Sequence, residues 1–437
     1  MNNYDQGDWK GHNPSFISLK IGEELRISIQ STTNPIQIKL VSGTAEYFGH
    51  ELVIDKTYTF HYNKCFLFTW NGCVLEVSGQ NIAEHTYVSN SNHQTMMNII
   101  DIYMKTIDKL KDENKRVLFL GKSSSTIKTI FRLFYSYSRR KISDLYVLNL
   151  NNRKQNGNLG ITLPECLSLC KTDPNIGLME IPLFDDCIGF EFHKLISYLG
   201  NEECSPIVLE KINDIMIGLA STTLIFGNLE KWNQWSAQEW DLFLTKWKID
   251  DVIVVGDEDF QQKLQNYNIR LQKNQNLYFI HILSGYAAFD TNWSQLKLQN
   301  QYKQYFYNTD LITKDVLLKP NTSPNIKLLS WKQNQWFKLK TAHNKQWNES
   351  ILPIQSEEEK KEKNKIILEP ILKWNQLKIK QLVAVFNNDG ITDLPITIGF
   401  ICIENINEQT GGITILNPTA EEFPINVKFC VGELLVL

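Results

Sequence analysis

The sequence lacks the usual features of secreted, membrane and nucleic-acid-binding proteins. Its N-terminus is polar without an apolar signal core, and no apolar run approaches membrane-spanning length. The 8 cysteines are scattered, with no Cys-x-x-Cys pair and no paired histidines, which argues against a disulfide framework and a zinc site. A net charge of −3 gives no general attraction to nucleic acid. These absences predict a cytosolic or nuclear protein with no metal site and no membrane partner, whose contact with RNA is weak or indirect.

The residues that are present predict three domains. A chain of 437 residues with 42% hydrophobic and 11% aromatic side chains is long and apolar enough for two or three cores. The early segments alternate in polarity between Gly, Asn and Asp turns, which predicts a β-sandwich or barrel over residues 1–95. Strands then alternate with helices, which predicts an α/β domain with a mostly parallel sheet over 96–310. The last part, 311–437, again has the pattern of strands, among them Asp315–Leu318 and Ile351–Ile354, and is expected to be mainly β.

The elements of the central domain are predicted from apolar runs and helical spacing. The expected strands are Val117–Leu120, Asp144–Leu150, Thr222–Phe226, Asp251–Val255 and Leu277–Leu283. The expected helices are Met96–Lys111, the segment after Gly121, Ile207–Leu219 and Ala237–Trp247. Any ligand should lie at the carboxyl ends of these strands, where Gly121 is found.

A damaged phosphate-binding loop follows the first of these strands. The standard loop is Gly-x-x-x-x-Gly-Lys-Ser/Thr: its backbone N–H groups surround the phosphates, its Lys reaches them, and its hydroxyl holds Mg²⁺. Counted from Gly121, Thr126 replaces the second Gly, Ile127 replaces the Lys, and Lys128 replaces the hydroxyl residue. A shift by one residue makes Lys128 and Thr129 the Lys-Thr pair, but then Ile127 stands at the second Gly. Neither register gives a standard loop.

Motifs along the whole chain carry a resemblance to a known family. The specific ones are Ser42–Leu52 (S-G-T-A-E-Y-F-G-H-E-L), Phe68–Gly79 and Tyr87-Val88-Ser89, and weaker matches follow in order at Gly121, Arg132-Leu133, Tyr137, Ser284-Gly285, Tyr305-Phe306-Tyr307, Gly399-Phe400 and Leu416-Asn417-Pro418. In these motifs the chain resembles the polynucleotide 5′-hydroxyl kinases that double as a subunit of the pre-mRNA cleavage factor (cleavage factor IA in yeast, cleavage factor II in animals). The resemblance implies a β domain, a P-loop domain and a C-terminal β domain.

The chain departs from this family at the groups that neutralise charge during phosphoryl transfer. Asn149 and Asn151 stand where the family has an Asp-x-Asp whose carboxylates serve the metal and the attacking hydroxyl. The family's Thr/Ser-x-Gly-Trp loop is missing near Phe226–Glu230, and Ser294–Gln304, which matches an arginine-rich lid, contains no Arg. Loss of one such group typically costs about 10²- to 10³-fold in rate. We therefore expect a pseudokinase with no catalytic residues.

The adenine side of the family's nucleotide site is retained. Glu24 and Lys64 match residues that contact the adenine end of ATP; the alternative is that they are ordinary polar residues on strand edges. On the phosphate side, hydroxyls and Lys128 could offer donors, whereas Ile127 places an apolar side chain there. ATP is expected as a structural ligand at most, and Mg²⁺ is left open. The expected contact residues are Glu24, Lys64, Gly121, Ser124, Ser125, Thr126, Ile127, Lys128 and Thr129.

The resemblance implies a nuclear function in mRNA processing. The leading hypothesis is a catalytically inactive scaffold subunit of the machinery for pre-mRNA 3′-end cleavage and polyadenylation, bound to a larger scaffold subunit of the cleavage factor. One alternative is an RNA 5′-hydroxyl kinase that uses the shifted Lys128-Thr129 loop and is associated with the tRNA-splicing endonuclease. Another is an adapter in a different RNA-processing complex.

Overall fold

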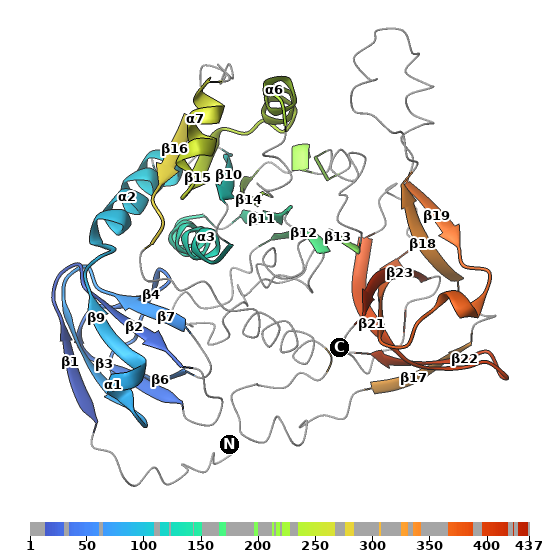
Figure 1. Ribbon diagram of the computed structural model, residues 1–437, viewed down its shortest axis with the longest axis horizontal. Helices are drawn as coiled ribbons and strands as arrows, with labels where there is room; N and C mark the ends of the chain where they lie inside the picture. The colour runs from blue at the N-terminus through green and yellow to red at the C-terminus, as the bar shows by residue number, and fades with distance from the viewer. Residues whose placement is uncertain are drawn as a thin grey trace.

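Three groups of elements follow one another along the chain (Figure 1). The computed structural model describes residues 14–29, 35–60, 64–108, 114–121, 124–142, 144–150, 166–171, 196–199, 212–213, 216–218, 221–227, 235–266, 276–283, 306, 325–330, 335–341, 366–387, 396–417, 423 and 427–435. An antiparallel β-sandwich comes first, a mostly parallel sheet with helices follows, and a mainly antiparallel sheet ends the chain. The predicted fold class is therefore confirmed.

Two antiparallel sheets form the N-terminal β-sandwich. The first has the order β1-β8-β3-β6, with β1 (Ser15–Leu19), β3 (Ile36–Gly43), β6 (Thr57–Phe60) and β8 (Cys73–Ser78). The second has the order β5-β4-β7-β2-β9, with β2 (Glu24–Ser28), β4 (Glu46–Tyr47), β5 (His50–Glu51), β7 (Lys64–Phe68) and β9 (Thr86–Ser89), which follows α1 (Ile82–His85). In β8, buried residues alternate with half-buried ones, as expected of a sheet with one face on the core.

Strand β10 (Arg116–Gly121) lies in the middle of the central sheet, whose order is β13-β12-β11-β14-β10-β15-β16. Five strands are parallel: β10, β11 (Leu145–Asn149), β14 (Thr222–Phe226), β15 (Asp251–Val255) and β16 (Asn276–Ile280). Two antiparallel strands that the sequence did not predict, β12 (Cys166–Lys171) and β13 (Ile196–Leu199), extend one edge. Both β14 and β15 are buried at every residue, because helices cover both faces of the sheet.

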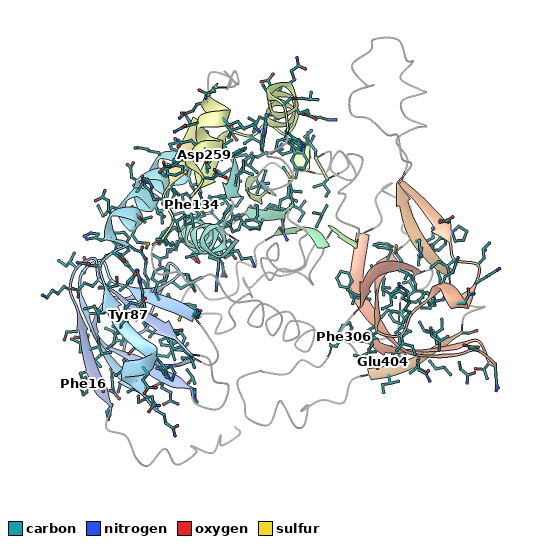
Figure 2. The ribbon with its side chains drawn as sticks, viewed as in Figure 1. Phe16, Tyr87, Phe134, Asp259, Phe306 and Glu404 are labelled. Carbon is teal, nitrogen blue, oxygen red and sulfur yellow. The ribbon has the colours of Figure 1, made fainter. Side chains whose placement is uncertain are left out.

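Helices pack on the two faces of this sheet. On one face, α3 (Ser124–Arg139) packs Phe131 and Phe134 against Phe119 of β10, with ring centroids 5.0 and 5.1 Å apart. Figure 2 labels Phe134 in the central domain. On the other face lie α6 (Ala237–Lys246) and the unpredicted α7 (Glu258–Asn266), which share a core with Leu118 and Leu120. Side chains of alternate residues in β10 therefore pack into the cores on opposite faces of the sheet.

Both edges of the central sheet are covered by neighbouring parts of the chain. At one edge, α2 (His93–Tyr103) continues into a π-helical turn (Met104–Asp108), and its Asn98 Nδ2 donates to the carbonyl of Phe279 in β16 at 3.1 Å. At the other edge, β13 contacts strands β21 (Ile396–Asn407) and β23 (Lys428–Leu435) of the C-terminal sheet (Figure 1). Such cover hinders pairing of a sheet edge with another chain. No helix in the described ranges is long and apolar enough to span a membrane.

The C-terminal sheet has the order β17-β22-β21-β20-β23-β18-β19 and is antiparallel except where β18 pairs with β23. Its strands are β17 (Asn325–Ser330), β18 (Gln335–Thr341), β19 (Ile366–Pro370), β20 (Gln381–Asn387), β21 (Ile396–Asn407), β22 (Gly412–Asn417) and β23 (Lys428–Leu435). The sequence did not predict β18. The predicted strands at 315–318 and 351–354 and most of the predicted helix at 207–219 lie outside the described residues.

Candidate functional site

The carboxyl ends of the parallel strands meet at Gly121, where β10 passes close to β15. A Cβ atom at Gly121 would lie 2.9 Å from the carbonyl oxygen of Val255 and 3.4 Å from the Cβ of Ile127. Glycine is therefore required at the end of β10 for a steric reason.

Ile127 belongs to the core of the central domain. Its side chain is 2% exposed and lies in the same cluster as Phe119 and Phe131, between α3 and the sheet. Of the next two residues, Lys128 is half-buried, whereas Thr129 is buried, with 5% of its surface exposed. Ser124, Ser125 and Thr126 form the first turn of α3. The helical phase of α3 thus turns Ile127 inward and leaves Lys128 partly exposed.

Asn149 ends β11 beside the carboxyl end of β14. It is 1% exposed and lies in register with Phe226, and the next backbone N–H, of Leu150, donates to the carbonyl of Phe226 at 2.8 Å. A buried neutral amide in this place holds no charge for a metal ion and accepts no proton as a general base. Asn151, residues 228–230 and the segment 294–304 lie outside the described residues.

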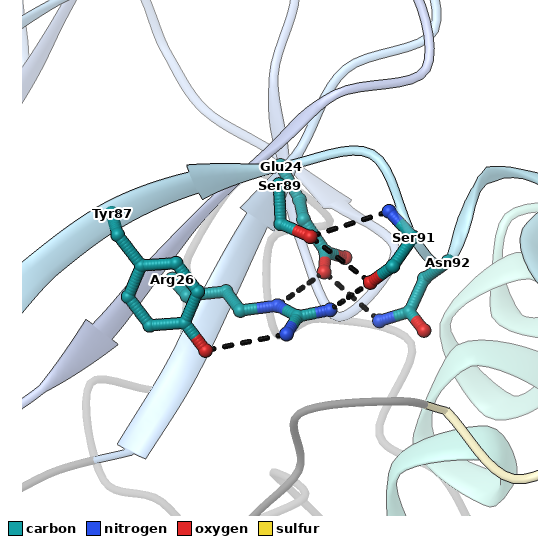
Figure 3. Close-up of polar contacts among 6 residues, drawn as sticks. All are labelled: Glu24, Arg26, Tyr87, Ser89, Ser91 and Asn92. Carbon is teal, nitrogen blue, oxygen red and sulfur yellow. Dashed lines mark hydrogen bonds and ion pairs between the residues drawn. The ribbon is translucent and has the colours of Figure 1, made fainter.

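Glu24, at the start of β2, is the centre of a polar cluster in which Glu24, Arg26 and Asn92 are buried and Tyr87 and Ser91 are exposed (Figure 3). Its Oε1 accepts hydrogen bonds from Arg26 Nε at 2.6 Å and from Asn92 Nδ2 at 2.9 Å. The guanidinium of Arg26 also donates to Tyr87 Oη at 3.2 Å and to Ser91 Oγ at 2.7 Å. We call these five residues the Glu24 cluster.

The second carboxylate oxygen of Glu24 has no hydrogen-bond donor in the part of the chain that the structure describes. The residue is 1% exposed, so water does not reach this atom freely. Burial raises the pKa of Glu24 above its ordinary value, although the charge of Arg26 and the bonds from Arg26 and Asn92 act in the opposite direction. An acceptor of this kind is costly unless a donor is supplied, for example an amino group of a ligand.

Lys64 is not part of the Glu24 cluster. In the register of β2 and β7, Glu24 lies opposite Phe68, whereas Lys64 lies opposite Ser28. A separation of four residues along a strand is about 13 Å. Sequence reasoning paired Glu24 with Lys64 and missed Arg26, Ser91 and Asn92. Arg26 could have been found, because residues two apart on a strand share a face.

The Ser42–Leu52 motif builds the contact between the N-terminal sandwich and α3. Tyr137 Oη donates to Glu46 Oε1 at 2.6 Å, and Trp70 Nε1 donates to the same oxygen at 3.2 Å. His50 Nε2 lies 2.9 Å from Ser136 Oγ. We call the contact between residues 46–51 and α3 the hairpin–α3 interface.

Cations and a glycine complete the hairpin–α3 interface. The guanidinium of Arg132 lies 4.4 Å from the ring centroid of Phe48, and Arg140 donates to the carbonyl of Gly49. Gly49 has a φ of 81°. Burial raises the pKa of Glu46 and, more strongly, that of Tyr137. The helix that follows the candidate loop is thereby fixed to the domain that carries the Glu24 cluster.

The described residues contain no group of three or more His, Cys, Asp or Glu side chains that could hold a metal ion. The candidate site in the described residues therefore consists of the Glu24 cluster and the end of β10 at Gly121.

In both sequence and fold, the chain is similar to Clp1 proteins, which are mRNA cleavage and polyadenylation factors. Residues 18–113 match the family model of the N-terminal beta-sandwich domain of polyadenylation factor. The mRNA cleavage and polyadenylation factor clp1 of Botryotinia fuckeliana is 31% identical over 141 residues, which are 31% of this chain and 30% of the relative. Its counterpart in Aspergillus fumigatus is 48% identical over 65 residues, 15% of this chain and 12% of the relative. The matched part spans less than a third of the length of these curated relatives.

Two solved structures resemble nearly the whole chain. One, of Clp1p with Pcf11p, concerns their extended interface and the loss of ATP in a point mutant; it has a TM-score of 0.72 at 15% identity and covers 97% of this chain and 99% of that one. The other, a wild-type Clp1p–Pcf11p complex, has a TM-score of 0.71 at 15% identity and covers 97% and 98%. At this identity the likeness shows the fold.

Proposed function

We propose, from its membership of the Clp1 family of mRNA cleavage and polyadenylation factors, that this chain is a non-catalytic scaffold subunit of the pre-mRNA 3′-end cleavage machinery. The family match lies in the N-terminal domain, and the Clp1p fold extends over nearly the whole chain. Its place of action would be the nucleus. The central P-loop-like domain would then serve for shape, for contact with a larger subunit and for holding a nucleotide without turnover.

The observation that carries the non-catalytic part of the proposal is Asn149. It is buried at the end of β11, where the resembled kinases place a carboxylate that serves metal and substrate. An amide there leaves phosphoryl transfer without its charge-neutralising partner and its base. Ile127 supports the same proposal, because an apolar side chain packed in the core stands where the standard loop has its phosphate-binding lysine.

The kinase alternative is favoured by one feature, the half-buried Lys128 next to Thr129 on α3. The test is transfer of labelled phosphate from ATP to an oligoribonucleotide with a 5′-hydroxyl. We expect no transfer above the background of a preparation that carries Lys128→Ala. Transfer by the unchanged protein that Lys128→Ala abolishes would overturn the non-catalytic proposal, and Thr129→Ala would then be expected to weaken the dependence on Mg²⁺.

ATP retention is supported by the Glu24 cluster. The residues on the adenine side would fit such a ligand once the Glu24 carboxylate opened toward it, since its Oε2, buried in this structure, has no described donor and the exocyclic amino group of adenine is one. When bound, ATP would supply that donor, and Arg26 and Asn92 would keep the carboxylate in place. Lys64, about 13 Å away along the strand, would contribute separately if at all.

The measurement for ATP is calorimetric titration with and without Mg²⁺. We expect micromolar binding that weakens by about 10- to 100-fold in Glu24→Gln, because the amide can keep the bond from Arg26 but presents an NH₂ group to the ligand. A matched control is Glu84→Gln on α1, an exposed glutamate outside the cluster. Absence of binding to the unchanged protein would remove ATP from the proposal and leave the scaffold function standing.

The scaffold function is tested by the partners of the tagged full-length protein. In the similar structures Clp1p is in a complex with Pcf11p, and we propose that this chain binds a larger scaffold subunit in a comparable way. Purification should recover cleavage and polyadenylation subunits. Recovery of the tRNA-splicing endonuclease without them would favour the kinase alternative, and recovery of neither would favour an adapter in another RNA-processing complex.

A further inference from the structure

A short loop in the C-terminal sheet is fixed at several points although its surface side chains face water. The loop joins β19 to β20, spans residues 371–380 and contains a 3₁₀ turn, η4 (Trp374–Gln376). Ile371 and Leu377 are 7% and 5% exposed and pack in the core of the C-terminal sheet. The backbone N–H of Ile371 donates to the carbonyl of Trp336 at 2.9 Å, and that of Lys380 donates to the carbonyl of Ile403 at 2.6 Å. The loop is therefore held in one conformation.

Between these anchor points the loop exposes apolar and basic side chains together. Leu372 is 79% exposed and Ile379 is 53% exposed, and Lys373 and Lys378 are also exposed. The sequence from 370 to 388 contains no Asp or Glu. We call residues 372, 373, 378 and 379 the basic–apolar loop surface.

Among the residues that the structure describes, one of the three lysines of this loop forms an ion pair and two do not. Lys380 forms an ion pair with Glu404 on β21 at 2.6 Å, and Figure 2 labels Glu404 in this domain. In contrast, Lys373 and Lys378 have no acidic partner among the residues that the structure describes. Two lysines without a described acidic partner, in the same loop as two large exposed apolar side chains, are complementary to an acidic segment that also carries apolar residues.

The apolar side chains distinguish this ligand from a nucleic acid. A phosphate backbone would pair with the lysines, but it would leave Leu372 and Ile379 in water. A polypeptide with both acidic and apolar residues buries them and pairs the lysines at the same time. Because the loop is fixed by its buried anchors, little conformational entropy would be lost on binding.

We propose that the basic–apolar loop surface is a docking site for an acidic, leucine-containing segment of a partner protein. The surface lies outside the candidate nucleotide site and does not depend on ATP binding or on the absence of catalysis. It would give the C-terminal domain its own partner contact within the assembly.

The test uses the full-length protein and fluorescence anisotropy with a short labelled peptide that combines Glu and Leu. A peptide with Lys in place of Glu and a single-stranded oligouridylate are the comparison probes. We expect the acidic peptide alone to bind, with affinity falling by about tenfold when salt is raised from low to near-molar concentration.

Two double variants separate the two components of the site. Lys373→Glu with Lys378→Glu should weaken binding of the acidic peptide by about tenfold or more, and Leu372→Ser with Ile379→Ser by a similar factor. The matched controls, Lys20→Glu with Lys56→Glu and Phe16→Ser with Ile21→Ser, change exposed residues of the N-terminal sandwich and should leave binding unchanged.

The outcomes are distinct. Failure of the acidic peptide to bind, or binding that the control variants reduce as much as the loop variants do, overturns the proposal. Binding of the oligouridylate that depends on the two lysines but not on the apolar pair would assign the surface to RNA instead and would also overturn it. Circular dichroism and thermal unfolding of each variant show whether it is folded before its binding is compared.

Discussion

Replacing Tyr137 by Phe tests whether the buried hydrogen bond at the hairpin–α3 interface holds the N-terminal sandwich on the central domain. The variant keeps the aromatic ring and removes only the hydroxyl that donates to Glu46 at 2.6 Å. Glu46, which is 4% exposed, then retains one described donor, Trp70 at 3.2 Å. A hydrogen bond to a charged group contributes about 1.5–3 kcal/mol, so we expect the free energy of unfolding to fall by about 2 kcal/mol at a pH where Glu46 is charged.

The loss should depend on pH in a direction that Glu46 determines. Because burial raises its pKa from 4.5, the folded protein binds this proton more tightly than the unfolded protein does. The contribution of Glu46 to stability is therefore largest below pH 4.5 and decreases as the pH rises through the raised pKa. Removal of the hydroxyl raises this pKa further, since the bond from Tyr137 lowers it. The deficit of Tyr137→Phe should be about 1 kcal/mol where Glu46 is protonated and about twice that where it is charged.

The assay is urea unfolding followed by tryptophan fluorescence at about pH 5 and about pH 8. Tyr103→Phe is the matched control: its hydroxyl is also buried, but it donates to the neutral carbonyl of Tyr137 at 3.0 Å. The control should lose about 1 kcal/mol at either pH. Equal losses for Tyr137→Phe at the two pH values, or a smaller loss than that of the control at pH 8, would refute the assignment of a charged hydrogen bond to this interface.

Three further changes test other parts of the argument. Gly49→Ala should destabilise the protein by about 2 kcal/mol or more, because its Cβ would lie 2.9 Å from a side-chain carbon of α3. The control is Gly72→Ala, which is also at positive φ but whose Cβ would have its nearest neighbour at 3.3 Å. Thermal unfolding should show a smaller loss of stability for the control. Ile127→Lys should cost several kcal/mol by burying an ammonium group and should give no phosphate transfer in the labelled-ATP assay. Arg26→Met should cost about 3 kcal/mol by leaving the Glu24 carboxylate under-paired, and urea unfolding should show this deficit shrinking as the pH falls toward 4.5.

The sequence by itself determined the three kinds of domain and most of the strands. Runs such as Thr222–Phe226 and Asp251–Val255 were predicted with the bounds that the structure has, because uninterrupted apolar runs in a parallel sheet leave little doubt about where the strand lies. The Ser42–Leu52 motif also predicted the family of the N-terminal domain. The domain boundaries at 95 and 310 stay predictions, as do the nucleotide contacts of the loop.

Only the tertiary structure decided which polar groups meet. Glu24 is bonded to Asn92, 68 residues away, and Glu46 to Tyr137, 91 residues away. Sequence periodicity assigns a residue to a face of its strand or helix, but the partner on that face depends on the register and packing of distant elements. The same reason explains Ile127: its position in the chain suggested the phosphate loop, whereas the phase of α3 against the sheet placed it in the core, where burial of its apolar side chain is favourable.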